Sequence, residues 1–345
     1  MLPEFRRSAG AAGASKKARP LGRANPRSVV YQALLAAAVG LTAWYLIANA
    51  VENILARRIA SGFGFLWREA GFEIGETTFL PYDAGDTYLR ALTIGLLNTF
   101  RVAILAIFFS TLLGVFIGLA RLSLNWLLVK LAEGYIEVIR NVPLVVQLFF
   151  WYAVITESLP TPAEALSPLP GVFLTNRGFA FPILVAAAPI ELDYPVFTGF
   201  NFSGGGLLSP EFTALLLGLT LYTAAFIAEI VRAGVLAVDR GQFEAAYSLG
   251  LNHRQAMRFI IMPQALRVIV PPVTSQYLNC TKNSSLAVAI GYPDLVSIAN
   301  TTINQTGQAI EGIAIIMLVY LTISLAISGF MNWYNRRFAL RGAKL

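Results

Sequence analysis

Charged residues are scarce in this sequence. Asp, Glu, Lys and Arg make up 13% of its 345 residues, whereas residues of the AVILMFWYC set make up 56% and mean hydropathy is +0.63. Soluble globular proteins have about 25% charged residues, and a soluble fold of this length would not cover its surface with so few. The composition therefore favours one polytopic membrane domain over two soluble domains.

Several residue types and motifs that carry chemistry are also rare or missing. One cysteine, Cys280, and one histidine, His253, exclude an internal disulfide framework and a metal centre built from several Cys or His ligands. The sequence contains no G-x-x-x-x-G-K-[ST] phosphate loop, so we expect no ATP hydrolysis by this chain. We predict no catalytic residues, no metal and no cofactor.

The basic residues gather at the two ends of the chain. Residues 1–28 contain seven Lys or Arg and one Glu, and the last ten residues contain four Lys or Arg and no acidic residue. The interior is net negative, so it offers no basic stripe to follow a nucleic acid. Because Lys and Arg beside membrane spans stay in the cytoplasm, both termini are predicted to be cytoplasmic and the number of crossings even.

Six apolar segments are each long enough to cross about 30 Å of hydrocarbon, which takes roughly 20 residues. They cover residues 29–51, 102–120, 127–155, 212–238, 268–299 and 310–334. We interpret the first as an uncleaved anchor. The alternative is a cleavable signal peptide, since Ala48-Asn49-Ala50 resembles a cleavage site, but the apolar run is longer than that of a signal peptide.

The charges of the connecting segments agree with this topology. Segments 52–90 and 156–211, assigned outside, are net acidic, and segment 239–267, assigned inside, holds four Arg against two acidic residues. Segment 156–211 also contains several prolines and a Gly-Gly-Gly run, which predicts an irregular external loop.

Ionisable residues within spans are costly and usually face protein or water. The third span carries four of them at steps of three, four and three, which places them on one helical stripe: Lys130, Glu133, Glu137 and Arg140. The fourth span carries Glu229 and Arg232. Local ion pairing explains Lys130 with Glu133 and Glu229 with Arg232 equally well, whereas Glu137 and Arg140 lie deeper and are candidates for a pathway or a gate.

The fifth span is interrupted by the polar residues 279–285, which include Lys282, Asn283 and Ser284. As one straight helix, 32 residues would reach about 48 Å, so a bent or broken helix fits better. Broken helices are common at transporter substrate sites. The alternative is a short cytoplasmic loop between two short helices, which would give an odd number of crossings.

An ordered motif occupies the segment between the fourth and fifth spans. Glu244, Ala245 and Ala246 are followed after three residues by Gly250, and nine residues later the motif continues with Ile260, Met262 and Pro263. Helix-forming residues on both sides of Gly250 predict two short helices with a turn at this glycine. Such an elbow, held on two spans, would transmit motion from a docked partner.

This segment resembles the EAA loop of the permease subunits of bacterial ABC importers, with Met262 where leucine is common. Residues 135–144, 225–232 and 278–291, together with 61–69 and 332–337, are similar to the permeases of general L-amino-acid importers. The resemblance covers about residues 50–338. In that family the loop between the third and fourth spans commonly holds an extra pair of membrane helices, whereas this chain has only the short apolar stretch 179–189.

The resemblance implies an all-α integral-membrane fold: the MetI-like core of a type I importer permease with one extra N-terminal helix. The implied organisation is a basic tail (1–28), an anchor (29–51), a periplasmic segment (52–90), a permease domain (91–338) with external loop 156–211 and coupling loop 239–267, and a cytoplasmic tail (339–345). The implied location is the bacterial inner membrane.

The resemblance also implies partners. This subunit would form half of a pathway with a second permease, expected to be a different chain, and a periplasmic binding protein would deliver an L-amino acid. A separate ATPase pair would dock at the coupling loop, whose implied contact residues are Glu244, Ala245, Ala246, Gly250, Ile260 and Pro263.

The candidate pathway residues are Glu137, Arg140, Glu229, Lys282, Asn283 and Ser284. We expect the third and fifth spans to face each other across an aqueous cavity, because a zwitterionic substrate needs both donors and acceptors when it leaves water. An alternative role for Lys282 is to neutralise a nearby carboxylate. An ion-coupled secondary transporter is the competing function, but no internal duplication is visible. An integral-membrane enzyme would need a convergent catalytic set, which is not found.

Overall fold

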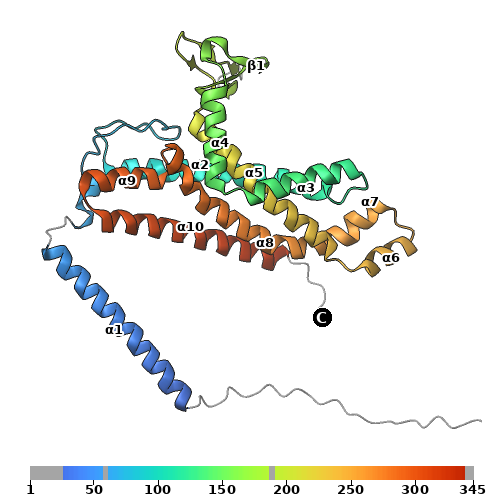
Figure 1. Cartoon of the computed structure of the whole chain (residues 1–345), viewed down its shortest axis with the longest axis horizontal. Coiled ribbons are helices and arrows are strands. Elements are labelled where there is room, and N and C mark those ends of the chain that lie inside the picture. Colours follow the sequence, from blue (N-terminus) through green and yellow to red (C-terminus); the bar gives the residue numbers. More distant parts are fainter. Residues whose placement is uncertain (1–25, 57–60, 186–190, 339–345) are drawn as a thin grey trace, which may run out of the picture. The chain divides into compact units, whose positions relative to one another are not determined.

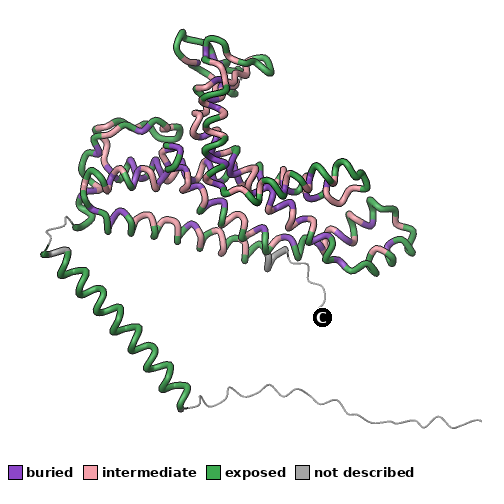
Figure 2. Tube along the Cα trace, viewed as in Figure 1, coloured by how far each residue is buried: buried purple, intermediate pink, exposed green. Residues whose placement is uncertain are grey.

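The computed structural model describes residues 26–56, 61–185 and 191–338, and the chain divides into two units, Met1–Ile59 and Ala60–Leu345. The first unit contains α1 (Pro26–Ala56), whose described side chains are exposed along its whole length (Figure 2). Its 31 residues would extend about 46 Å, which is enough to cross a bilayer. The predicted tail 339–345 and residues 1–25 of the basic tail lie outside the described residues.

The second unit is mainly helical (Figure 1). Its α-helices are α2 (Tyr88–Ala120), α3 (Trp126–Asn141), α4 (Leu144–Ala153), α5 (Pro210–Leu236), α6 (Arg240–Ser248), α7 (His253–Ala256), α8 (Met262–Asn283), α9 (Leu295–Thr306) and α10 (Ala309–Phe338). Short 3-10 helices are η1 (Phe63–Trp67), η3 (Pro162–Glu164) and η5 (Ser284–Ile290), and π-helical turns are η2 (Val154–Ser158) and η4 (Met257–Ile261).

Five described helical segments are long and apolar enough to cross a membrane: α1, α2, α5, the run His253–Ile290, and α10. The bent pair formed by α3 and residues 144–158 would be a sixth. The predicted number of six spans agrees with this count when the bent pair is taken as one crossing.

Helices α2 and α5 form the centre of the packing, and two glycines allow their close approach. A Cβ atom at Gly114 would lie 2.7 Å from the Cβ of Ile227, and one at Gly118 would lie 2.8 Å from the Cβ of Val231. Small residues at such crossings let helix backbones come together in membranes. The buried Val102 and Leu219 belong to the core cluster that α2 and α5 share with α4 and η5.

The third predicted span bends by 104° where α3 meets α4. Val142 has an extended backbone there, with φ −98° and ψ 128°, because the following Pro143 disfavours the helical conformation. The buried Gln147 donates from Nε2 to the carbonyl oxygens of Ile139 at 2.8 Å and Val142 at 3.0 Å. The side chain thus satisfies carbonyls that the bend leaves without helical partners.

The fifth predicted span is not interrupted where the polar residues stand. Helix α8 continues through residues 279–283 and changes at Ser284 into the 3-10 helix η5, which ends at Gly291 with φ 82°. Ser284 and Ser285 donate to the carbonyl oxygens of Thr281 and Lys282 at 2.7 and 2.8 Å. These bonds satisfy the two hydroxyls within the helical run. The run ends later, at residues 291–294, before α9 begins.

Segment 156–211 is not the irregular loop predicted from its prolines and glycines, because it contains short antiparallel strands. Four form one sheet in the order β1 (Leu166–Leu169), β2 (Val172–Thr175), β3 (Gly178–Phe181), β8 (Gly206–Leu208). Two further pairs are β4 (Ile183–Val185) with β5 (Glu191–Asp193), and β6 (Val196–Phe197) with β7 (Phe202–Ser203).

Gly178, with φ 114°, follows the β2–β3 turn, where a residue with a side chain would have a strained backbone. Residues 186–189 of the predicted apolar stretch lie outside the described residues.

Segment 61–87 is folded against the helices. The buried residues Phe65, Ala70 and Ile74 form one cluster with Tyr88 of α2 and Leu295 of α9. This packing brings residues 72–78 close to the start of α5 and to the β strands, where they line two cavities.

Candidate functional site

The predicted two-helix elbow is present as α6 and α7, between α5 and α8 (Figure 1). Asp239 caps α6 by accepting a hydrogen bond from the Gly241 backbone N–H at 2.6 Å. Gly250 has φ 75° and ends the first helix, and Asn252 and Gln255 form a reciprocal capping box at the start of the second. Helix caps of this kind fix where each short helix begins and ends.

The elbow is attached to the membrane helices by its buried residues and is otherwise exposed. Ala246 and Ala256 are buried, and Ile261 lies in a core cluster with Val235 of α5 and Ala265 of α8. Glu244, Ala245 and Gly250 are exposed and Leu249 is 77% exposed, while Ile260 and Pro263 are half-buried. The predicted coupling residues therefore divide into a buried residue, Ala246, two half-buried residues, Ile260 and Pro263, and an exposed outward face that contains Glu244, Ala245 and Gly250.

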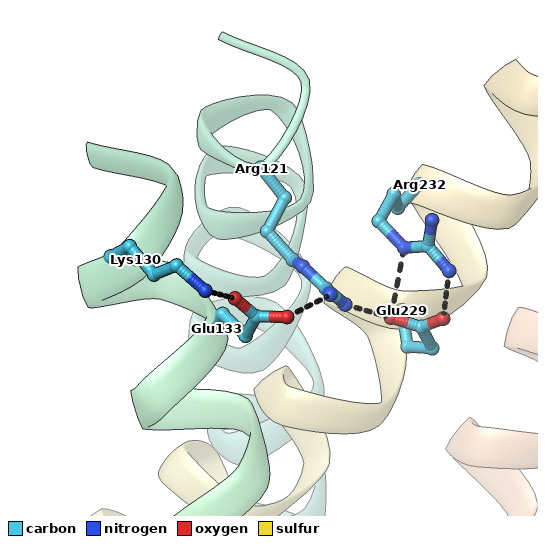
Figure 3. Close-up of polar contacts among 5 residues, drawn as sticks. All are labelled: Arg121, Lys130, Glu133, Glu229 and Arg232. Carbon is cyan, nitrogen blue, oxygen red and sulfur yellow. Dashed lines mark hydrogen bonds and ion pairs between the residues drawn. The ribbon is translucent and has the colours of Figure 1, made fainter. Parts of the chain in front are cut away.

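An ion network of five residues joins α3 and α5 to the residue that follows α2 (Figure 3). Arg121, directly after α2, pairs with Glu229 of α5 and with Glu133 of α3. Lys130 completes the network on one side through Glu133 at 2.9 Å, and Arg232 on the other side through Glu229. The sequence pattern indicated the two outer pairs but missed Arg121, whose only signal was its place at the end of the second span.

A cavity of about 400 Å³ lies beside this network. Its lining includes Glu137, Arg140 and Glu229, three of the six predicted pathway residues, together with Arg121 and Arg232. The guanidinium of Arg140 lies 4.9 Å from the centre of the Phe226 ring, a cation–π arrangement. Positive and negative groups thus line one cavity, whose volume lies in the range of small-molecule sites.

The other three predicted pathway residues do not line this cavity. Lys282 is exposed, Asn283 is half-buried and Ser284 is buried, all near the end of α8. Lys282 makes no ion pair with any described residue. The single chain therefore does not join the third and fifth predicted spans across one cavity, and the role of these residues stays a prediction.

Comparisons with known proteins agree in one family. The family model for "Binding-protein-dependent transport system inner membrane component" matches residues 110–340. The putative amino-acid ABC transporter permease protein YhdX of Escherichia coli K12 is 47% identical over 381 aligned positions, covering 93% of this chain and 96% of that protein. The general L-amino acid transport system permease protein AapQ of Rhizobium johnstonii is 41% identical, covering 91% and 92%.

Solved structures of ABC transporters also resemble this chain. The chain is similar to the crystal structure of an amino acid ABC transporter with histidines, with TM-score 0.53 and 30% identity over 72% of this chain and 95% of that chain. A methionine ABC transporter, MetNI, has the same fold at 14% identity and TM-score 0.50, covering 72% and 97%. With its apolar helices and its EAA elbow, this chain belongs to the binding-protein-dependent transport system inner membrane components, the multi-pass permease subunits of ABC importers.

Proposed function

We propose that this chain forms half of the membrane pathway of an ATP-driven importer of L-amino acids, together with a second, different permease. The chain is a transport subunit of the inner membrane, and its family works with an ATPase on separate subunits and with a binding protein. The observation that carries the proposal is the close likeness to permeases named for amino-acid transport along more than nine-tenths of the chain.

The outward face of the elbow is the proposed docking surface for the ATPase. It combines an acidic group, Glu244, with an exposed apolar side chain, Leu249. The buried attachment of Ile261 to α5 and α8 would carry a movement of the docked ATPase into the membrane helices. Rigid elements that pass such displacements are typical of coupling in packed proteins.

The cavity of Glu137, Arg140 and Glu229 is the proposed part of the pathway on this subunit. Arg140 would hold the carboxylate of an amino acid, and Glu137 would hold its ammonium group. Lys282, Asn283 and Ser284 are proposed to border the same pathway in the assembled importer. Glu137, Arg140 and Lys282 are exposed in the single chain, so a second permease would enclose them.

The proposed orientation has both termini in the cytoplasm, supported by the basic residues at the two ends. Reporter fusions after Pro170 are expected to report the periplasm, and fusions after Arg254 and Lys344 the cytoplasm. A periplasmic signal at Arg254 would overturn the orientation, because the elbow would then be out of reach of an ATPase.

The test of the function is reconstitution of the chain with its ATPase, its binding protein and a second permease in lipid vesicles. We expect uptake of labelled L-amino acids that requires ATP and ceases when any of the four components is omitted. Full uptake without the ATPase would favour an ion-coupled transporter, and full uptake without a second permease would show that two copies of this chain suffice.

A further inference from the structure

Two adjoining cavities lie where residues 72–78 meet the β strands and the start of α5. The arginine cavity, of about 370 Å³, takes its name from Arg177 and is also lined by Thr77, Thr175 and Asn201. The glutamate cavity, of about 450 Å³, takes its name from Glu73 and Glu211. The two share Gly75, Glu76 and Ser209 in their linings, so they are neighbours across a common wall.

The charge of the common wall is already balanced. Glu76 pairs with Arg101 at 2.8 Å, and each of these side chains is 11% exposed. Arg101 also donates to the hydroxyl of Thr78 at 2.8 Å and lies 4.1 Å from the centre of the Phe212 ring. A ligand at the wall therefore meets a satisfied ion pair rather than a free carboxylate.

On the two sides of the wall, the charged side chains form no ion pairs with the residues that the structure describes. Arg177 is the single basic residue of segment 156–211 and is exposed, with its guanidinium 4.2 Å from the centre of the Phe200 ring. Glu73 and Glu211 make no ion pair with any described residue, although Glu211 accepts a hydrogen bond from the hydroxyl of Tyr152 at 3.0 Å. A positive group thus lies in one cavity and two negative groups in the next.

We propose that the two cavities form a receiving site for a zwitterionic α-amino acid on the outer face of this subunit. Arg177 binds the carboxylate, because a guanidinium whose face rests on an aromatic ring keeps its N–H edge free for a bidentate contact. Glu73 and Glu211 accept the ammonium group. The receiving site rests on the proposed function and orientation, and it is separate from the cavity of Glu137 and Arg140 at the other end of the helices.

The arrangement fits a zwitterion better than an ion of one sign. An anion held by Arg177 would be repelled by the two carboxylates of the glutamate cavity, and a cation held there would leave Arg177 without a partner. The volumes of both cavities lie in the range of small-molecule sites. The hydroxyl of Thr77 and the amide of Asn201 supply further neutral groups in the arginine cavity, whereas the hydroxyl of Thr175 is engaged by the backbone of Arg177 and Gly178.

The test is protection of a cysteine placed in the arginine cavity. The native Cys280 is buried and is the only cysteine of this chain. Cys280→Ala therefore gives a background in which Thr77→Cys is the one thiol of this subunit, and its reaction with a membrane-impermeant maleimide is read on the separated subunit. Labelling is followed in vesicles that hold the whole importer, without binding protein, while free L-glutamine is titrated as the probe. Two analogues of L-glutamine, one without the carboxylate and one without the amine, are titrated in parallel.

We expect L-glutamine to slow the labelling of Thr77→Cys and each analogue to protect poorly. In Arg177→Gln the concentration for half-protection should rise about ten- to a hundred-fold, the loss that corresponds to one charge-assisted hydrogen bond. Glu211→Gln should also raise the concentration of L-glutamine that gives half-protection. Arg68→Gln is the matched control, because Arg68 is an exposed arginine that lines neither cavity, and it should leave half-protection unchanged.

Three results would overturn the receiving site: no protection, equal protection in Arg177→Gln, or equal protection of Ser167→Cys, which is exposed and lies outside both cavities. Uptake by the same vesicles with binding protein added tests the proposed function separately. Uptake without protection of Thr77→Cys overturns the receiving site alone, whereas no uptake of any L-amino acid overturns the proposed function and the receiving site with it.

Discussion

Substitution of Gly250 tests whether the turn of the elbow is needed for coupling. Gly250 has φ 75°, in the left-handed region that costs a residue with a Cβ about 1–2 kcal/mol. An added Cβ would meet no atom of the described chain within 4 Å. Within this subunit the cost is therefore backbone strain alone, and it is about the same for alanine and leucine.

A strain of that size changes the population of the formed turn about 5- to 30-fold. Because α6 has nine residues and α7 four, neither helix is stable without the elbow's contacts. The turn at Gly250 therefore sets the orientation of α6 relative to α7, and with it the shape of the outward face. We expect Gly250→Ala to lower uptake for each ATP hydrolysed and Gly250→Leu to lower it further, since the larger side chain would also meet a docked ATPase. Gly250→Asn should retain most activity, because asparagine tolerates this conformation.

The assay is ATP hydrolysis and amino-acid uptake measured on the same reconstituted vesicles, with the amount of ATPase bound as a third reading. Gly64→Ala is a control, since Gly64 has no positive φ and open space around it, and it should leave all three readings unchanged. Equal uptake for each ATP in wild type, Gly250→Ala and Gly250→Leu would refute the reasoning. Membrane insertion should be normal in every variant, because Gly250 lies outside the candidate spans.

Three further substitutions test other parts of the site. Glu244→Lys reverses the charge of an exposed elbow residue and should weaken ATPase binding at low salt more than at high salt, and normal binding at low salt would contradict its docking role. Arg121→Gln leaves Glu133 and Glu229 without their shared partner and should lower the midpoint of thermal unfolding by a few degrees, and an unchanged midpoint would mean that the network contributes little. Lys282→Met should reduce uptake about ten-fold with normal expression if this residue borders the pathway, whereas unchanged uptake would assign it a structural role.

The helices and the elbow could be predicted because their signals are local. Apolar runs indicated the positions of α2, α5 and α10, and the spacing from Glu244 to Gly250 and Pro263 indicated the two short helices and their turn. Each of these features depends on residues within about one helical turn or one span. They can be recognised without knowing which residues far away in the sequence they contact. The start of α2 was predicted wrongly: the helix begins at Tyr88 and not at residue 102, because Arg101 lies inside the helix rather than at its end.

The end of the fifth span could not be placed from polarity alone. The polar run at residues 279–285 indicated a break, but there the chain changes from α-helix to 3-10 helix at Ser284 without leaving the helical run. The hydroxyls of Ser284 and Ser285 are satisfied by carbonyls three residues earlier, so these polar residues do not require a break. The actual break follows Gly291, whose left-handed backbone ends η5. Gly291 is the local signal for this position, because a glycine in the left-handed conformation ends a helix whereas polar side chains do not.

The strands of segment 156–211 were missed for a different reason. They are two to four residues long and are separated by proline and glycine, so no run is long enough to show the alternation by which strands are recognised. The pairing of β3 with β8 joins residues 178–181 to 206–208, across a stretch of sequence that carries no sign of this contact. Such a small sheet is defined by its long-range pairs rather than by local preference.

The exposure of charged residues on apolar helices gives the strongest physical reason for a second permease. Glu137 and Arg140 on α3 and Lys282 on α8 are exposed in the single chain, and a charge facing lipid at mid-depth costs about 2.5–3.5 kcal/mol even on the insertion scales that give low values. Pairing within the subunit does not remove this cost, because the described ion network engages Glu133 and Glu229 but none of these three. Water in a pathway enclosed by another protein would remove this cost. The same three side chains would then supply both signs of charge to a zwitterion. One arrangement would thus keep the charges away from lipid and place them where the proposed substrate passes.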